Sequence, residues 1–322
     1  MPMSVPARLR AFGVARALAY LERDPDANLP RLMEWIDRFA GERLSPSHQA
    51  LVHRVMTDPE NNWNRLIKSM YADIDSRVLK KLFENFVIYG DVMDWPRRKA
   101  EGRLGQDLAP WSVIIDPSFP CDMRCSGCGA SIYGVQPYME FDSLDEEIEA
   151  RKARQCYLFI FNGGNPLARE QEIIALCNKH TDCVFAAFTP PQSITEQLCE
   201  DLLRVRNLFP AIRVDVDKVD AVRATALLRR YRLPFGVACR CTSENADQVA
   251  TPPYFQAVID SGAKFCWFFT CLAYGPEPPA TPEQLVEIHR RVQASREHIP
   301  LLTLDFWDGP SPSASAPQGG YV

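Results

Sequence analysis

The chain has 322 residues, a formal net charge of -5, 46% hydrophobic residues and 24% charged residues. This composition is ordinary for a globular protein with one large domain and an appendage. A protein that binds nucleic acid through its phosphates usually displays a basic face, so the negative charge argues against nucleic acid as a partner. No stretch reaches the roughly 18 uncharged apolar residues that a membrane helix needs, so we expect no membrane partner either.

The cysteines indicate a reducing compartment. The chain has 11, an odd number, and eight of them are scattered, several inside apolar runs such as 155–158 and 264–268. Such cysteines behave as small buried hydrophobic residues. A secreted disulfide-rich protein would be shorter and would carry a signal peptide, whereas the apolar stretch at 12–21 is interrupted by Arg16. We therefore expect a cytoplasmic protein.

Residues 1–105 are predicted to form an all-helical region. They contain no clear strand-like run, and their apolar residues recur at helical spacing between capping and breaking residues. One helix is expected to begin at Leu29, with Pro30 in its first turn. The next helices are expected to begin at Ser45-Pro46, at Trp63 and at Ser76, the last of them running to Tyr89.

From Trp111 onward, short β-branched and aromatic runs alternate with amphipathic helical stretches. Strands are expected near residues 112–116, 157–162, 184–189, 212–216, 235–239 and 265–270, with a seventh candidate at 301–306. This alternation predicts an α/β fold with parallel strands, most simply a partial (β/α)6 barrel over residues 106–308. A flat doubly wound sheet is the alternative. Residues 309–322, rich in proline and serine, are predicted to be a disordered tail.

Three closely spaced cysteines follow the first predicted strand. Cys121, Cys125 and Cys128 are separated by three and then two residues. Three thiolates suit a [4Fe-4S] cluster in which the fourth iron stays open to bind a small molecule. The alternative is a structural zinc site, but zinc needs four ligands and usually takes cysteines as two close pairs. The nearest candidates for such a fourth ligand are the remote Cys239 and Cys241.

A second loop is expected at the same end of the sheet. Gly163, Gly164, Asn165 and Pro166 follow the second predicted strand, where glycines let the backbone approach a ligand and proline stiffens the chain. The carboxyl ends of parallel strands lie at one edge of a sheet, so this loop and the cysteines would face the same opening. An ordinary strand-to-helix turn is the alternative for the glycines.

With these two motifs the chain resembles the radical S-adenosylmethionine (radical SAM) superfamily. The cysteine spacing matches its cluster loop, and residues 163–166 resemble its glycine-glycine-glutamate-proline motif, which contacts the amino group of S-adenosylmethionine (SAM). Residues 82–86, Asp116-Pro117, 182–185 and 262–265 resemble a bacterial subfamily with a helical N-terminal region. That subfamily usually continues into a cysteine-bearing C-terminal extension, whereas this chain has no cysteine after Cys271. We therefore expect a single cluster.

The resemblance implies a reaction and its partners. SAM would bind the open iron through its amino and carboxylate groups, and an electron from the [4Fe-4S] cluster, itself reduced by a flavodoxin or ferredoxin, would cleave its sulfonium bond. The resulting 5′-deoxyadenosyl radical would abstract hydrogen from a small-molecule substrate, a metabolite or a natural-product intermediate. The catalytic residues implied are Cys121, Cys125 and Cys128. The alternative is a degenerate relative that keeps the cluster only for binding or for a partner protein.

Several positions depart from the family pattern. Asn165 replaces the usual glutamate, so a charged acceptor for the SAM amino group becomes a weaker neutral one. Tyr133 is the nearest candidate for the aromatic residue usually found beside the third cysteine. The segment after the fourth strand is shorter than in the family. Arg213 and Asp215, on one face if the strand continues, could contact the SAM carboxylate and ribose there or form a salt bridge.

Overall fold

A computed structural model describes residues 13, 16–39, 46–86, 112–116, 139–154, 156–214, 218–270, 278–305 and 320–321. Its helices are α2 (Pro25–Phe39), α3 (Pro46–Thr57), α4 (Asn62–Asp73), α5 (Ser76–Glu84), α8 (Phe141–Ala153), α9 (Glu170–Lys179), α10 (Glu196–Val205), α11 (Lys218–Arg230), α12 (Pro252–Asp260) and α13 (Pro282–Ser295), with short 3-10 turns η3 (Pro166–Arg169) and η4 (Pro191–Ser193). Its strands are β1 (Ser112–Ile115), β2 (Leu158–Phe161), β3 (Val184–Thr189), β4 (Leu208–Arg213), β5 (Gly236–Cys241), β6 (Phe265–Thr270), β7 (Leu302–Asp305) and β8 (Gly320–Tyr321).

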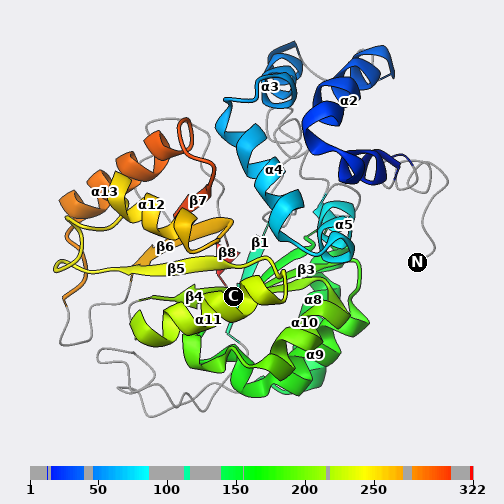
Figure 1. The fold of residues 1–322 in the computed structure, drawn as a ribbon. Coiled ribbons are helices and arrows are strands. Elements are labelled where there is room, and N and C mark those ends of the chain that lie inside the picture. The colour runs from blue at the N-terminus through cyan, green and yellow to red at the C-terminus, as the bar shows by residue number, and fades with distance from the viewer. Residues whose placement is uncertain are drawn as a thin grey trace.

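The strands form one parallel sheet. Strands β1 to β7 are neighbours in chain order, and the two-residue β8 pairs with the free edge of β1. Helices connect successive strands and cover the outer side of the curved sheet (Figure 1). The predicted α/β partial barrel is therefore confirmed, and it includes the seventh strand. The predicted domain boundary near residue 105 and most of the predicted tail fall outside the described residues.

The fourth strand lies earlier than predicted. It spans Leu208–Arg213 instead of residues 212–216, and Pro210 is the reason that its start is hard to recognise. Phe185 N donates to the carbonyl of Asn207 at 2.7 Å, so the backbone groups of Asn207 point toward β3. Successive residues of a strand direct their backbone groups to opposite neighbours, and those of Pro210 therefore point toward β5. Pairing with β5 begins only at Ala211, so the missing N–H of Pro210 costs no ladder bond.

Helix α2 also starts earlier than predicted, at Pro25 instead of Leu29. The Asp24 carboxylate accepts a hydrogen bond from Ala27 N at 3.0 Å, and Pro25 occupies the first helical position, where its missing N–H is harmless. Pro30 consequently lies inside the helix rather than in its first turn. The predicted start of α3 at Pro46 is confirmed.

Helices α4 and α5 cover the amino-terminal end of the barrel. The buried side chains of Ile74, Val78, Leu79 and Leu82 belong to the same hydrophobic core as the strands. A separate small cluster of Leu21, Leu29 and Met56 holds the preceding helices together. The helical region is thus continuous with the barrel core through α4 and α5.

Polar side chains fasten this helical region to the turns that precede the strands. Lys264, just before β6, donates to Asp73 at 2.5 Å and to Ser69 at 3.1 Å. Arg232, before β5, donates to the carbonyl oxygens of Ala72 and Ile74, which end α4. Asn62 donates to the carbonyls of Arg296 and Ile299, before β7. The bonds from Arg232 and Asn62 satisfy backbone carbonyls that the helix ends leave open, whereas those from Lys264 join side chains.

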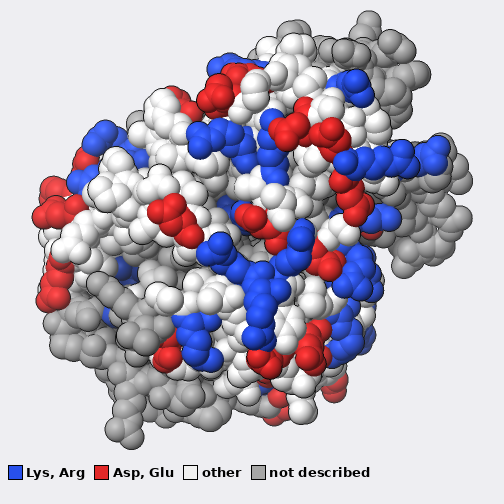
Figure 2. Space-filling model, viewed as in Figure 1, with Lys and Arg blue, Asp and Glu red and all other residues white. Residues whose placement is uncertain are grey.

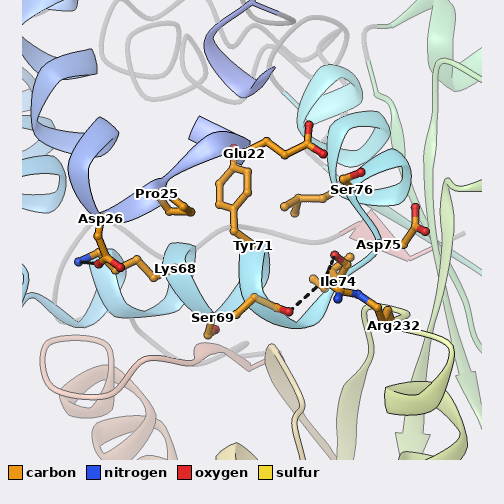
Figure 3. Close-up of a pocket in the computed structure, with 12 residues that line it drawn as sticks. Glu22, Pro25, Asp26, Lys68, Ser69, Tyr71, Ile74, Asp75, Ser76 and Arg232 are labelled. Atoms are coloured by element: carbon orange, nitrogen blue, oxygen red, sulfur yellow. Dashed lines mark hydrogen bonds and ion pairs between the residues drawn. The ribbon is translucent and has the colours of Figure 1, made fainter. Parts of the chain in front are cut away.

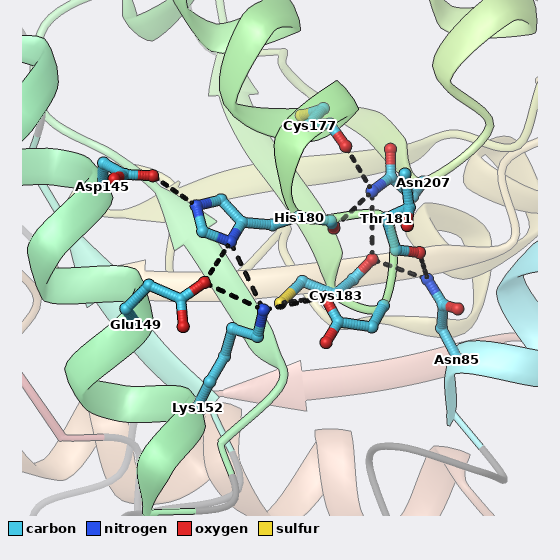
Figure 4. A network of polar contacts seen from close by, with 10 residues as sticks. Asn85, Asp145, Glu149, Lys152, Cys177, His180, Thr181, Cys183 and Asn207 are labelled. Carbon is cyan, nitrogen blue, oxygen red and sulfur yellow. Dashed lines mark hydrogen bonds and ion pairs between the residues drawn. The ribbon is translucent and has the colours of Figure 1, made fainter. Parts of the chain in front are cut away.

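Asn85 makes the corresponding contact before β3. Its amide donates to the carbonyls of Thr181 and Cys183 at 3.0 and 2.7 Å (Figure 4). Asn207 bonds the same turn from the other side, at the carbonyls of Cys177, His180 and Cys183. The subfamily resemblance at residues 82–86 therefore includes a residue that positions β3.

The fully buried His180 lies next to this turn. Its Nε2 is 2.9 Å from an Asp145 oxygen, and its Nδ1 is 3.2 Å from a Glu149 oxygen (Figure 4). Burial raises the pKa of Asp145. Hydrogen bonds from Lys179 and His180, together with the charges of these residues, lower it by more than burial raises it, so the net pKa lies below its usual range. This network ties α8 to the turn between α9 and β3 and lies at the amino-terminal end of the barrel, like Asn85.

Aromatic contacts identify the concave face of the sheet. Phe188 of β3 packs against Trp267 and Phe269 of β6 at ring distances of 5.5 and 5.7 Å, although β4 and β5 lie between these strands. Such contacts are made only across the inside of a curved sheet. Phe268 packs instead against Tyr254 and Phe255 of α12, so it marks the outer face.

Gly236 makes room for an aromatic ring on the concave face. A Cβ at this position would lie 2.2 Å from the Phe265 ring, which itself packs edge-on against Phe209 at 5.5 Å. We expect Gly236→Ala to lower the free energy of unfolding by about 1–3 kcal/mol because the ring must leave its packed position. Chemical denaturation measures this loss.

The matched control is Gly13→Ala, whose added methyl meets no described atom within 4 Å. Phe265→Leu combined with Gly236→Ala should restore part of the lost stability, because the smaller side chain relieves the overlap. A Gly236→Ala variant as stable as the Gly13→Ala variant would contradict this packing.

Candidate functional site

Several predicted site residues, together with Asp116, lie at the carboxyl-terminal ends of the parallel strands. Asp116 follows β1, the segment Gly163–Pro166 follows β2, and Arg213 ends β4. Of the other predicted site residues, those outside the described part of the chain are Cys121, Cys125, Cys128, Tyr133 and Asp215. The glycine loop and Arg213 therefore lie at the end of the sheet from which the cysteine segment emerges.

Strand register places Asp116 and Arg213 on the concave face. Arg213 pairs with Ala238, which pairs with Trp267, one of the residues that identify this face. In β1, Ile114 pairs with Ile160, and Asp116 lies two residues beyond it on the same side. β4 ends at Arg213, and Asp215 lies outside the described residues, so its expected place on the same face as Arg213 stays a prediction.

Gly163 lies directly against Asp116. It has a φ of 65°, in the left-handed region that favours glycine, and Gly164 follows with a φ of 28°. A Cβ on Gly163 would lie 3.0 Å from Cγ of Asp116. Glycine is therefore needed at 163 both for the backbone turn and for the close approach of the carboxylate.

Asp116 is exposed to solvent just after the end of β1. Partial desolvation of its carboxylate raises the pKa of Asp116, while the positive charge of Arg213 lowers it, and the net pKa lies above its usual range. No hydrogen bond from another described residue contributes to that balance. Sequence reasoning used Asp116 only as part of a resemblance and did not assign it a role.

Asn165 is engaged within the protein. Its side chain is buried, its amide donates to Ser193 Oγ at 2.8 Å, and its carbonyl accepts from Thr189 Oγ1 at 3.2 Å. These contacts join the loop after β2 to the end of β3. Thr189 and Ser193 were missed by sequence reasoning, and polar residues at a strand end followed by Pro190-Pro191 were the available signal.

The described cysteines are suited to packing. The seven that the structure describes are free and buried: Cys156, Cys177, Cys183, Cys199, Cys239, Cys241 and Cys266. Burial raises the pKa of Cys156 to about 11 and that of Cys199 to about 12, so these thiols stay protonated, whereas metal ligands are thiolates. The prediction that scattered cysteines are core residues is confirmed for these seven.

Cys239 and Cys241 face the helices. They lie on the outer side of β5, opposite in register to Ala238 and Arg240. The pKa of Cys241 is raised, first by the neighbouring Cys239 thiol and then by burial. Within the described residues, no three histidine, cysteine, aspartate or glutamate side chains are grouped to hold a metal ion. A zinc site that recruits Cys239 or Cys241 from this face is not supported.

Two cavities lie elsewhere in the molecule, one near the amino-terminal end of the barrel and one on the outer face of the sheet. One, of about 780 Å³, lies where α4 and α5 meet the turn at Arg232 and is lined by Glu22, Lys68 and Tyr71 (Figure 3). Lys68 is paired with Asp26 at 2.5 Å there. The other, of about 700 Å³, lies between α11, α12 and the outer face of β5.

The surface carries charges of both signs close together. Figure 2 shows basic and acidic side chains interspersed over one face of the molecule. Described ion pairs include Arg230 with Glu196 and Arg204 with Asp201. Among the described residues, no helix is both long and apolar enough to cross a membrane.

The chain is similar to several solved structures at low sequence identity. No protein-family model and no curated protein sequence matches the chain. The chain is similar to SuiB from Streptococcus suis bound to S-adenosylmethionine, with a TM-score of 0.49, 14% identity, and coverage of 65% of this chain and 54% of SuiB. For native anSMEcpe with bound AdoMet, the TM-score is 0.44, the identity 18%, and the coverage 60% and 63%.

A third similar structure is the radical S-adenosylmethionine methyltransferase TsrM from Kitasatospora setae with cobalamin and a [4Fe-4S] cluster bound. Its TM-score is 0.35, its identity 14%, and the match covers 50% of this chain and 36% of TsrM. The chain spans less than two thirds of the length of each of these three proteins.

Asn165→Ala should destabilise the protein. The substitution leaves the buried hydroxyl of Thr189 without its acceptor and removes the bond to Ser193, so we expect a loss of about 1–3 kcal/mol in unfolding free energy. Urea denaturation measures it. Gln197→Ala, which removes an exposed 3.5 Å contact to Asp201, is the control and should change stability by less than about 0.5 kcal/mol. Equal stabilities of the two variants would show that Asn165 is not a structural tie.

Proposed function

We propose that the protein is a radical SAM enzyme with one [4Fe-4S] cluster held by Cys121, Cys125 and Cys128. The observation that carries the proposal is positional: the cysteine segment leaves β1 at the same edge of a parallel half-barrel where the loop Gly163–Pro166 leaves β2. Active sites in parallel β/α folds lie at this edge. Three thiolates in one short segment form a donor set that suits an iron–sulfur cluster with an open iron.

When bound, the cluster supplies the electron that cleaves SAM into methionine and a 5′-deoxyadenosyl radical. The protein's own contribution is placement. Gly163 and Gly164 bring the backbone close to the ligand, and Pro166 begins a short 3-10 turn that fixes the exit of the loop. Arg213, half-buried on the concave face, is a candidate for the SAM carboxylate because a guanidinium binds carboxylates through paired hydrogen bonds. Tyr133 and Asp215 remain candidates for further SAM contacts.

The substrate in this proposal is a small molecule, a metabolite or a natural-product intermediate, from which the radical abstracts hydrogen. A flavodoxin or ferredoxin would reduce the cluster in the cytoplasm. Phe188, Trp267 and Phe269 line the concave face and would exclude water from the radical.

A second candidate is a degenerate relative that binds the cluster without cleaving SAM. The observation that favours it is Asn165, whose amide and carbonyl are both hydrogen-bonded within the protein. Position 165, which contacts the SAM amino group in the family that the chain resembles, here holds a side chain that is already hydrogen-bonded to Ser193 and Thr189.

Anaerobically reconstituted and reduced protein should convert SAM to 5′-deoxyadenosine, measured by chromatography. Cys121→Ala, Cys125→Ala and Cys128→Ala should each abolish the product, since a missing thiolate prevents assembly of the cluster. Cys199→Ala, which alters a buried cysteine of α10, is the matched control and should retain activity.

The outcomes separate the candidates. A wild-type protein with full iron and sulfide content but no 5′-deoxyadenosine would favour the non-catalytic relative. Zinc bound in place of iron would contradict both.

A further inference from the structure

Asn165 stands where the family motif has a glutamate, and another carboxylate, that of Asp116, lies beside the same loop. Asn165 carries no charge, and its polar atoms bond to Thr189 and Ser193. Asp116 is the carboxylate that lies against the same loop, where a Cβ on Gly163 would come within 3.0 Å of its Cγ. Its carboxylate is exposed, and no described residue donates a hydrogen bond to it.

Arg213 completes a pair of opposite charges on this surface. It lies on the concave face, as Asp116 does, and is close enough for its positive charge to influence the Asp116 carboxylate. The α-amino acid end of SAM carries an amino group with N–H donors and a carboxylate that accepts. A carboxylate and a guanidinium on one surface match these two groups, and both hydrogen bonds are strengthened by charge.

We propose that Asp116 is the acceptor for the amino group of SAM, in place of the side chain at position 165. Asn165 is then a positioning residue: it holds the loop against β3 so that Gly163 stays packed on the carboxylate. Arg213 binds the carboxylate of the same ligand. This assignment rests on the proposed function, and it explains why residue 163 must be glycine for a reason beyond its backbone angle.

Equilibrium dialysis without reductant tests the assignment independently of SAM cleavage. The probes are S-adenosylhomocysteine and its 4-thiobutyrate analogue, which lacks only the amino group, both offered to anaerobically reconstituted protein. The wild type should bind the first more tightly. Asp116→Asn should reduce that preference about tenfold, because a charge-assisted hydrogen bond is lost while the side-chain volume is kept.

Asp116→Glu, which keeps the charge on a longer side chain, should retain part of the preference. Asp247→Asn is the matched control, since Asp247 is an exposed carboxylate in the turn that follows β5, and it should retain all of it. Thermal unfolding of each variant shows that the fold is intact.

An Asp116→Asn variant that is folded and keeps the wild-type preference would overturn the assignment. So would an equal loss in Asp247→Asn, which would indicate a general effect of charge. Failure of the wild type to cleave SAM, with the preference and its dependence on Asp116 intact, would overturn the proposed function but not the binding role of Asp116.

Discussion

The register of the parallel strands is the constraint on which the rest of this structure depends. In a parallel sheet, paired residues share a face, so one contact across the inside, such as that of Phe188 with Trp267, fixes the orientation of every strand. A shift of one residue would turn Arg213 and Arg240 toward the helices and the thiols of Cys239 and Cys241 toward the inside. The contact of Phe265 with Gly236 favours this register, because only glycine leaves room for the ring.

The two ends of the barrel have different tasks. At the amino-terminal end, side chains of Asn62, Asn85 and Arg232 bond to backbone carbonyls of helix ends and turns, and Lys264 bonds to side chains of α4. These bonds and the shared apolar core make α4 and α5 part of the barrel. The carboxyl-terminal end carries Asp116, Arg213 and the loop Gly163–Pro166, which the proposed function assigns to ligand binding, so the stabilising contacts and the proposed site lie at opposite ends of the strands.

The loop after β2 resembles the glycine-glycine-glutamate-proline motif of the radical SAM superfamily, with Asn165 in place of the glutamate. Burial of Asn165 among Thr189 and Ser193 replaces a charged side chain by a neutral structural tie. An unpaired carboxylate so deep in the protein would be costly, whereas Asp116 stands at a solvent-accessible point beside Arg213. In the proposed arrangement the negative charge has moved from one loop to the neighbouring strand end.

The sequence by itself determined the α/β alternation, the approximate positions of six of the seven main strands and the cysteine segment, because these depend on local hydrophobic periodicity and on ligand spacing. It misplaced the start of β4 because a proline is unusual inside a strand. Pro210 is tolerated there because its nitrogen points toward β5 before the pairing of β4 with β5 begins at Ala211. It also overlooked Asp24 as the cap of α2. The tertiary structure alone decided that Asn165 is tied to β3, that Cys239 and Cys241 face the helices, and that Asp116 touches Gly163. Each of these facts depends on which residues distant in the chain meet across the sheet, and no local pattern specifies that.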